Sequence, residues 1–234
     1  VLVGFASHIG NAILRDEDVA QMPRNGLVAV RPADVGLRLA PRDPRCFQRQ
    51  QRARALKRKG LSHGEAHQLL FNGNYFGSVM VACGDADALL SGVGMHYPET
   101  IRPALQVIGP HPKAEIVSGL YMLVFEKHVI FCGDTTVNID PTAEQLAQIA
   151  YSAGRIVRNF GIPPKIAMLS FSNFGSVRHP EAEKVAKAVA ILRKRDPALV
   201  VDGEMQADTA MDESILHAAY PFSALKERAN VLIF

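Results

Sequence analysis

The 234-residue sequence lacks several features that would place it in a specialised class of protein. It has no tryptophan and only three cysteines, Cys46, Cys83 and Cys132, which are far apart and odd in number. This pattern argues against the disulfide framework of small secreted domains, and it contains no pair at the spacing of a zinc site. Cysteines used in this way are typical of a reducing compartment, so we expect a cytoplasmic location.

Charge and long apolar runs are also scarce. The formal net charge is only +3, and apart from a basic stretch at residues 49–59 the lysines and arginines are scattered. Nucleic-acid binding would need a stronger basic surface. No apolar run reaches the roughly 18 residues of a transmembrane helix, and residues 1–4 look like a strand rather than a signal peptide. We therefore expect neither a nucleic-acid partner nor a membrane.

The common catalytic motifs are missing as well. The sequence has no Gly-x-Ser-x-Gly nucleophile motif, no Walker loop, and no histidines or cysteines at metal-binding spacing. Gly92-x-Gly94 lacks the third glycine, and also the acidic partner about 20 residues later, that a dinucleotide site requires. The motifs therefore predict no metal site and give little support to a dinucleotide site.

Apolar runs that alternate with helical patterns are what the sequence does contain, and this order is typical of an α/β protein. Strands are predicted at residues 1–4, 27–30, 88–90, 116–125, 129–131, 166–171, 199–201 and 231–234. Helices are predicted at residues 9–14, 46–58, 62–70, 77–82, 100–105, 140–160 and 180–195. The Gly109-Pro110-His111-Pro112 segment indicates a crossing between domains, so we expect a first lobe at 1–109 and a second at 110–234.

Two of the predicted helices begin with capping patterns. Ser62 is followed three residues later by Glu65, which is the capping-box pattern. Asp140 precedes Pro141, which predicts aspartate as the N-cap and proline as the first helical residue.

Two segments repeat the order strand, small polar turn, helix. The first passes from the strand at 88–90 through Ser91–Gly94 into a helix with Arg102 in its first turn. The second passes from the strand at 166–171 through the polar turn at 172–176. Ligands bind at the carboxyl ends of strands in open α/β sheets, and helix N-termini attract anions. These turns are the candidate binding segments.

A structural role is open for each polar segment. Arg102 is equally consistent with a solvated side chain on an ordinary strand-to-helix connection, and the 172–176 turn with a loop that satisfies its own backbone. The basic stretch at 49–59 fits a solvated helical face or a phosphate contact. The acidic loop at 202–208 fits a general base or carboxylates that cap a helix.

Ser91-Gly92 followed by Tyr97-Pro98-Glu99-Thr100-Ile101-Arg102-Pro103-Ala104-Leu105 resembles the phosphate acetyltransferase family. It is more similar still to the phosphotransacetylase-like C-terminal domain of bacterial NADP-dependent malic enzymes. The resemblance covers nearly all of the chain after about Pro44. It continues, in the family's order, through residues 119–123, 134–146, 169–177 and 201–210.

The resemblance implies a fold of two α/β lobes with open, mostly parallel sheets and a ligand cleft between them, like that of isocitrate and isopropylmalate dehydrogenases. It also implies that the chain is truncated at both ends, so that the first lobe lacks the family's N-terminal and C-terminal segments. Arg102 matches the family arginine that engages the phosphate of acetyl phosphate, and a second family arginine falls at Lys57. The family's serine–arginine pair and its catalytic aspartate would lie beyond Phe234. The implied ligand-binding residues are Tyr97, Thr100, Arg102, Ser172, Asn173, Gly175 and Ser176.

The function that the resemblance implies first is a regulatory domain of an NADP-dependent malic enzyme that binds acetyl-CoA as ligand or effector. NADP, a divalent metal and the oxidative decarboxylation of malate to pyruvate would then belong to a malic-enzyme catalytic domain in cis, absent from this chain. On this reading the fragment alone is inactive, and it forms a dimer or higher homo-oligomer. The alternatives are an active phosphate acetyltransferase, acting on acetyl-CoA and acetyl phosphate, and an oligomerisation module with a vestigial cleft.

Overall fold

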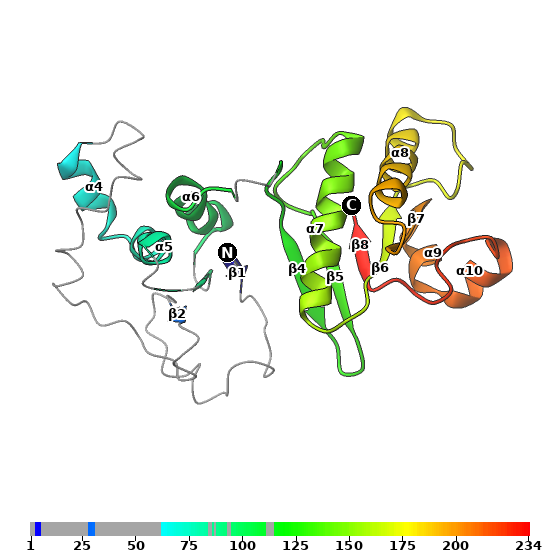
Figure 1. Ribbon diagram of the computed structural model, residues 1–234, viewed down its shortest axis with the longest axis horizontal. Coiled ribbons are helices and arrows are strands. Elements are labelled where there is room, and N and C mark those ends of the chain that lie inside the picture. Colours follow the sequence, from blue (N-terminus) through cyan, green and yellow to red (C-terminus); the bar gives the residue numbers. More distant parts are fainter. Residues whose placement is uncertain are drawn as a thin grey trace. The chain divides into compact units, whose positions relative to one another are not determined.

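A computed structural model of the chain describes residues 3–5, 28–30, 62–83, 86, 88–92, 95–110 and 115–234. The chain divides into two compact units, Val1–His111 and Pro112–Phe234, which are described here one at a time (Figure 1). The helices predicted at 9–14 and 46–58, and with them Lys57, lie outside the described residues. No helix in the described part of the chain has the length and apolar character needed to cross a membrane.

The first unit contains a three-stranded sheet in the order β1-β3-β2. β1 (Val3–Phe5) runs parallel to β3 (Ala88–Ser91), and β2 (Val28–Val30) runs antiparallel to β3. The described helices of this unit are α4 (His63–Leu69), α5 (Gly73–Cys83) and α6 (Tyr97–Val107). The predicted strand-to-helix connection therefore exists as the passage from β3 to α6.

The start of α4 confirms the predicted capping box. The Glu65 backbone N–H donates to the Ser62 hydroxyl at 3.3 Å, and the Ser62 N–H donates to the Glu65 carboxylate at 2.8 Å. The prediction that Arg102 lies in the first turn of its helix was wrong. α6 begins at Tyr97, because Pro98 has a fixed φ that suits a first helical turn, and Arg102 is therefore in the second turn.

The second unit is a five-stranded sheet in the order β4-β5-β8-β6-β7. Its strands are β4 (Leu120–Val124), β5 (Val129–Gly133), β6 (Lys165–Leu169), β7 (Val200–Met205) and β8 (Val231–Ile233). β5, β8, β6 and β7 are parallel, and β4 is antiparallel to β5. This mixed, mostly parallel sheet confirms the predicted α/β class.

Four helices follow the strands of this sheet: α7 (Ala143–Asn159), α8 (Pro180–Arg195), α9 (Ala207–Met211) and α10 (Glu213–Ala219). The prediction that Asp140 caps α7 was wrong. Thr142 is the N-cap, and it forms a capping box with Gln145 in which each side chain bonds the other's backbone N–H. Asp140 instead bonds Lys184 on α8.

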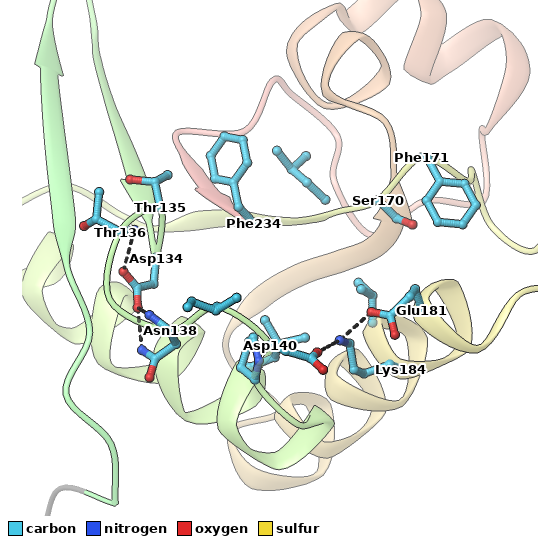
Figure 2. Close-up of a pocket in the computed structure, with 15 residues that line it drawn as sticks. Asp134, Thr135, Thr136, Asn138, Asp140, Ser170, Phe171, Glu181, Lys184 and Phe234 are labelled. Carbon is cyan, nitrogen blue, oxygen red and sulfur yellow. Dashed lines mark hydrogen bonds and ion pairs between the residues drawn. The ribbon is translucent and has the colours of Figure 1, made fainter.

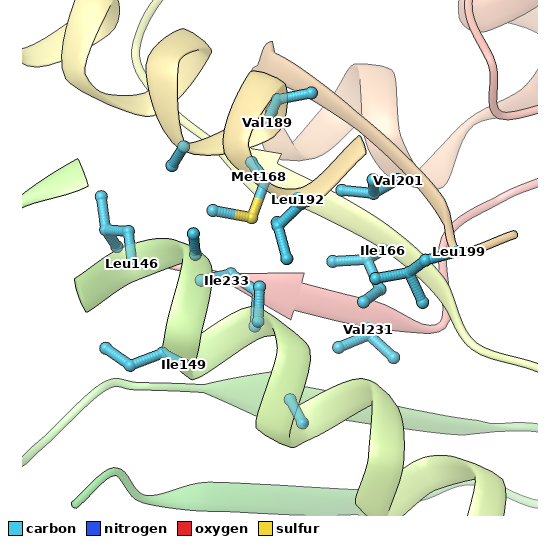
Figure 3. Packing of buried hydrophobic residues seen from close by; sticks show 14 of the residues in the cluster. Leu146, Ile149, Ile166, Met168, Val189, Leu192, Leu199, Val201, Val231 and Ile233 are labelled. Carbon is cyan, nitrogen blue, oxygen red and sulfur yellow. The ribbon is translucent and has the colours of Figure 1, made fainter. Parts of the chain in front are cut away.

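Apolar side chains fill both faces of the five-stranded sheet. Successive residues of a strand point to opposite faces. Ile166 and Met168 pack under α7 and α8 (Figure 3). Ala167 packs on the other side with α9 and α10. All three are fully buried. Burial on both faces explains why these strands are continuous apolar runs in the sequence. β7 is the exception, because it carries the buried carboxylates of Asp202 and Glu204.

Candidate functional site

The carboxyl edge of the five-stranded sheet carries the candidate site. β5, β6 and β8 run parallel, so their carboxyl ends meet at one edge, which is where ligands bind in open α/β sheets. A pocket of about 710 Å³ lies there (Figure 2). It is lined by Asp134, Thr135, Thr136, Asn138, Ile139, Asp140, Pro141, Leu146, Leu169, Ser170, Phe171, Glu181, Lys184, Val185 and Phe234.

Asp134 organises the loop that forms one wall of the pocket. Its Oδ1 accepts backbone N–H groups of Gly119, Thr136 and Val137 at 3.1, 3.3 and 3.2 Å. Its Oδ2 accepts the backbone N–H of Asn138 at 3.0 Å and also the side-chain amide of that residue. Both oxygens of this buried carboxylate are therefore engaged in shaping the loop, which leaves Asp134 poorly placed to act as a base.

Lys184 supplies the pocket's ammonium group, and two carboxylates already hold it. Its Nζ lies 2.8 Å from Asp140 Oδ1 and 2.5 Å from Glu181 Oε2 (Figure 2). The hydrogen bonds that Lys184 donates to Asp140 and then to Glu181 raise the pKa of Lys184, so it stays charged at neutral pH. With Asp134 the lining contains three carboxylates against one ammonium. The described lining therefore offers no spare positive charge to an anion.

The remaining lining is neutral, with hydroxyl groups on one part and apolar side chains on another. Thr135, Thr136 and Ser170 supply the hydroxyls. Phe171 and Phe234 are about half exposed at the pocket, with 51% and 53% of their surface accessible. Pockets that bind organic ligands combine such apolar surface with a few polar groups. This arrangement suits an uncharged ligand segment with amide or carbonyl groups.

The predicted residues at 172–176 form the loop after β6, and their polar groups bond within the protein. The buried Ser172 hydroxyl donates to Glu204 Oε1 at 3.0 Å, and the Gly175 N–H donates to the same oxygen. The Asn173 amide exchanges two bonds of 2.7 Å with Gln206, and the Ser176 hydroxyl accepts the Asn173 N–H at 3.0 Å. The pocket lining includes the preceding Ser170 and Phe171 instead. A ligand role for 172–176 stays a prediction.

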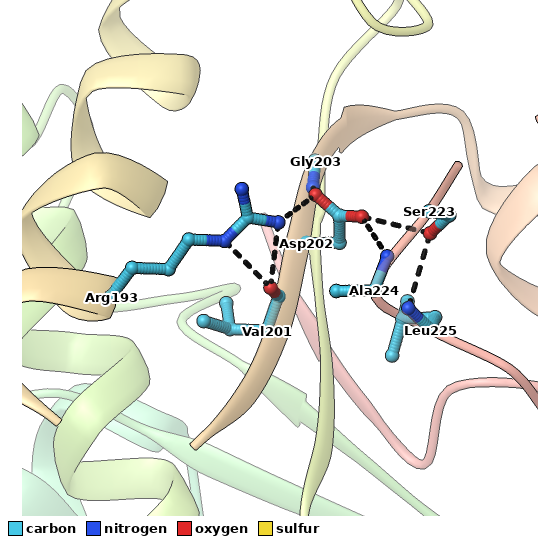
Figure 4. Close-up of polar contacts among 7 residues, drawn as sticks. All are labelled: Arg193, Val201, Asp202, Gly203, Ser223, Ala224 and Leu225. Carbon is cyan, nitrogen blue, oxygen red and sulfur yellow. Dashed lines mark hydrogen bonds and ion pairs between the residues drawn. The ribbon is translucent and has the colours of Figure 1, made fainter. Parts of the chain in front are cut away.

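The acidic segment predicted as a loop from 202 begins inside β7, which runs on to Met205, so that part of the prediction was wrong. Asp202 of β7 holds the second unit together (Figure 4). Buried Asp202 accepts bonds from the Arg193 guanidinium and from the Gly203 N–H through Oδ1. Its Oδ2 accepts the Ser223 hydroxyl at 2.8 Å and the Ala224 N–H at 2.6 Å. These bonds join β7, α8 and the loop at 220–225. They support the structural alternative for Asp202 over a general base.

Tyr97, Thr100 and Arg102 lie together on α6 of the first unit. The Thr100 hydroxyl is fully buried and has no hydrogen-bond partner among the residues that the structure describes. Arg102 is exposed and makes no ion pair or hydrogen bond with any residue in the part of the chain that the structure describes. The structure thus places the predicted binding residues in two groups, three on α6 and four on the loop after β6.

Sequence reasoning missed a buried asparagine beneath the start of α6. Asn74 on α5 is fully buried, accepts the Ser91 hydroxyl at 2.6 Å and donates to the Glu99 carbonyl at 3.1 Å. It therefore ties the end of β3 to the first turn of α6, where two of the predicted residues lie. The predicted helix started at residue 77, whereas α5 begins at Gly73, so Asn74 lay outside the predicted helix and its buried partners could not be expected.

The family model described as "Phosphate acetyl/butaryl transferase" matches residues 38–234. The phosphate acetyltransferase of Synechocystis sp. is 40% identical over 178 residues, which are 76% of this chain and 26% of that protein. The NADP-dependent malic enzyme of Escherichia coli is 37% identical over 179 residues, which are 76% of this chain and 24% of that protein. The chain thus spans about a quarter of the length of these two relatives.

Among solved structures, a phosphotransacetylase from Streptococcus pyogenes has a TM-score of 0.71 and 37% identity. The match covers 80% of this chain and 58% of that protein. It confirms a phosphotransacetylase-like α/β fold. The residues that carry the resemblance, from Ser91 to Ala210, all fall inside the segment that the family model matches.

Proposed function

The chain belongs to the phosphate acetyl/butaryl transferase family, and from this premise we propose that it binds acetyl-CoA as the regulatory, phosphotransacetylase-like domain of an NADP-dependent malic enzyme. The observation that carries the binding proposal is the pocket at the carboxyl edge of the five-stranded sheet, where hydroxyl and apolar side chains make up the uncharged part of the lining. The similarity to the malic enzyme of E. coli supports the choice of assembly.

The pocket fits the uncharged end of acetyl-CoA. The thioester and the pantetheine amides carry carbonyl and N–H groups but no charge, and hydroxyls such as those of Thr136 and Ser170 can bond both. Its single ammonium, Lys184, is already held by Asp140 and Glu181. Lys184 is therefore not available to the anionic phosphates of the ligand.

Arg102 is the residue to which we assign a phosphate. It is exposed, and its guanidinium is not committed to any acid in the described part of the chain. A guanidinium donates two parallel hydrogen bonds to a phosphate, which lysine does not. Lys57, the second residue matched to a family arginine, lies outside the described residues and stays a prediction.

Regulation requires that acetyl-CoA bind two states of the assembly unequally. On this proposal the malic reaction, with NADP and a divalent metal, takes place in a malic domain elsewhere in a cytoplasmic full-length protein. Among the described residues, no group of three or more histidine, cysteine, aspartate or glutamate side chains is arranged to hold a metal ion. The domain described here would supply the effector site only.

Calorimetric titration of acetyl-CoA into the full-length protein tests the binding. We expect Arg102→Ala to weaken binding by roughly tenfold or more, because a hydrogen bond to a charged group is lost. Arg102→Lys should recover part of the affinity. Arg155→Ala, which removes another exposed arginine on α7, is the matched control and should bind like wild type. A wild-type titration without heat at several temperatures would refute the binding proposal.

Malate oxidation by the same proteins tests the regulatory role. We expect acetyl-CoA to inhibit NADPH formation by wild type and by Arg155→Ala, and to have little effect on Arg102→Ala. Binding without any change in malate oxidation would retain the site and reject the regulation. If acetyl-CoA neither binds nor changes malate oxidation, the remaining hypothesis is an oligomerisation module with a vestigial cleft.

The second candidate function is phosphate acetyltransferase, which the 40% identity to the Synechocystis enzyme favours. The discriminating assay is acetyl transfer from acetyl-CoA to phosphate by the full-length protein, followed by release of free thiol. Transfer that depends on phosphate and falls strongly in Arg102→Ala would favour this function. Acetyl-CoA binding without transfer would favour the regulatory one.

A further inference from the structure

α6 has a proline in its interior, and this proline leaves one helical carbonyl without its usual donor. A helical carbonyl accepts the N–H of the residue four positions further along the chain. For the Glu99 carbonyl that residue is Pro103, which has no N–H and lies on the buried face of α6. The proline ring also pushes that carbonyl aside. The first turn of α6 therefore needs a hydrogen-bond donor from outside the helix.

Asn74 on α5 supplies this donor. Its Nδ2 donates to the Glu99 carbonyl at 3.1 Å and to the Met95 sulfur at 3.2 Å, while its Oδ1 accepts the Ser91 hydroxyl at 2.6 Å. These partners lie at the end of β3, in the turn that follows and in the first turn of α6. One fully buried amide thus joins the whole connection from β3 to α6.

The start of α6 depends on this amide more than most helix starts depend on a neighbour. His96 is the N-cap, but within the described part of the chain its side chain makes no capping bond. An interior proline is also where helices bend. The direction of α6 after β3 is therefore held from α5, through the bond between Asn74 and the Glu99 carbonyl.

We propose that Asn74 is a positioning residue for Arg102, because it fixes the turn of α6 from which Arg102 extends. This inference rests on the proposed contact between Arg102 and a phosphate. Arg102 lies three residues after Glu99 and directly before Pro103. A guanidinium holds a phosphate through two parallel N–H groups, so a small rotation of this turn misaligns it. A binding group is placed accurately only when residues behind it hold it.

The need for Asn74 depends on the proline. With alanine at position 103, a backbone N–H would donate to the Glu99 carbonyl inside the helix, and the amide of Asn74 would no longer be required there. Asn74→Ala should therefore weaken binding when residue 103 is proline and much less when it is alanine. A side chain that only filled space on α5 would be indifferent to residue 103.

Calorimetric titration of acetyl-CoA into the full-length protein tests the positioning role. We expect Asn74→Ala to raise Kd about tenfold, as Arg102→Ala does. When Arg102 is already alanine, Asn74→Ala should change Kd by less than about twofold, because the two residues act through one contact. A further tenfold loss in that double variant would overturn the inference. If Asn74→Ala binds like wild type while Arg102→Ala binds weakly, only this inference fails. If neither substitution weakens binding, the proposed phosphate contact of Arg102 fails with it.

Pro103→Ala provides a rescue that a merely structural role would not give. We expect Asn74→Ala/Pro103→Ala to bind acetyl-CoA at least about fivefold more tightly than Asn74→Ala. If Asn74→Ala does not fold, the double variant should fold. No gain in affinity, or failure of both variants to fold, overturns the inference.

Asn230→Ala is the matched control for these titrations. The Asn230 side chain also bonds two backbone groups, accepting the Lys165 N–H at 2.7 Å and donating to the Pro163 carbonyl at 2.9 Å in the second unit. Its loss should lower stability and leave Kd unchanged. An equal rise in Kd for Asn230→Ala would show that lost stability alone weakens binding, and it would overturn the specific role of Asn74.

Discussion

Gly203 is a residue whose surroundings admit no other side chain. Its φ is +138°, and a Cβ built on it would lie 2.5 Å from the backbone carbonyl oxygen of Met168 on the neighbouring strand. Neither strand can move away easily, because β6 and β7 are hydrogen-bonded on both sides of this point. We expect Gly203→Ala to lower the free energy of unfolding by about 3 kcal/mol, combining backbone strain with the clash. Urea denaturation measures the change.

Gly161→Ala is the matched control for that experiment. Gly161 also has a positive φ, +75°, but a Cβ there would meet nothing within 4 Å. Only the backbone strain remains, so we expect a loss of about 1 kcal/mol. Equal effects of the two substitutions would show that the close approach to Met168 contributes nothing.

Asp202 illustrates how a carboxylate suggestive of catalysis in the sequence can serve the fold. It is buried and accepts bonds from a guanidinium, a hydroxyl and two backbone N–H groups. We expect Asp202→Ala to cost about 3 kcal/mol, because removing one partner of a buried network leaves the others unpaired. Glu227→Ala removes an exposed carboxylate from its 2.6 Å pair with Lys165 and should cost much less, because an exposed ion pair is screened by solvent. Thermal unfolding of both variants measures these changes. Equal losses of stability would contradict a structural role for Asp202.

For single residues, the sequence singled out polar side chains such as Arg102 and Asp202 but did not show which of them serve the fold. Arg102 stood out through its motif and is exposed and uncommitted among the described residues. Asp202 stood out equally well, but its partners Ser223 and Ala224 lie more than 20 residues further along the chain. Such partners come close to Asp202 only in the folded chain, so no local sequence pattern indicates them. The bonds that occupy Asp202 could therefore not be predicted.

Among the elements, α7 shows why helix starts are hard to place. Asp140, Pro141 and Thr142 are consecutive, and either polar residue is an acceptable cap by its type. Thr142 caps because Gln145 completes the capping box. We expect Thr142→Ala to cost about 1 kcal/mol, measured by urea denaturation. Asp140→Ala should cost less, since it loses only an exposed ion pair. A larger loss of stability for Asp140→Ala than for Thr142→Ala would instead support Asp140 as the N-cap of α7.

The capping box of α4 should depend on pH. The Ser62 hydroxyl, and then its backbone N–H, hold the pKa of Glu65 below its ordinary value of 4.5. A carboxyl with a lowered folded pKa contributes stability that is fully present above the unfolded value and is lost as pH falls through the folded value. We therefore expect the start of α4 to fray as pH falls below 4.5, seen as faster hydrogen exchange at Ser62. Glu65→Gln should remove this dependence.

Strands were the elements that the sequence predicted best, and the pocket was what it could not predict. A strand that is buried on both faces has apolar residues at successive positions, so β5, β6 and β8 can be recognised in the sequence as apolar runs. The pocket depends on β8 lying between β5 and β6, an order that joins segments about 60 and 100 residues apart in the printed sequence. No local pattern encodes that order. The polar loop after β5 is visible in the sequence, but the sequence does not show that this loop lines one pocket together with Ser170 and Lys184.

For the whole molecule, ligand binding should appear as added stability. A ligand that binds only the folded state stabilises it by RT ln(1 + [L]/Kd), or about 2.7 kcal/mol at 100 times Kd. We expect acetyl-CoA to raise the Tm of the full-length protein and of Arg155→Ala by equal amounts. At the same concentration Arg102→Ala should show a smaller shift, because its Kd is larger. Equal shifts in all three proteins would mean that acetyl-CoA binds without Arg102, and the phosphate would then need another cation.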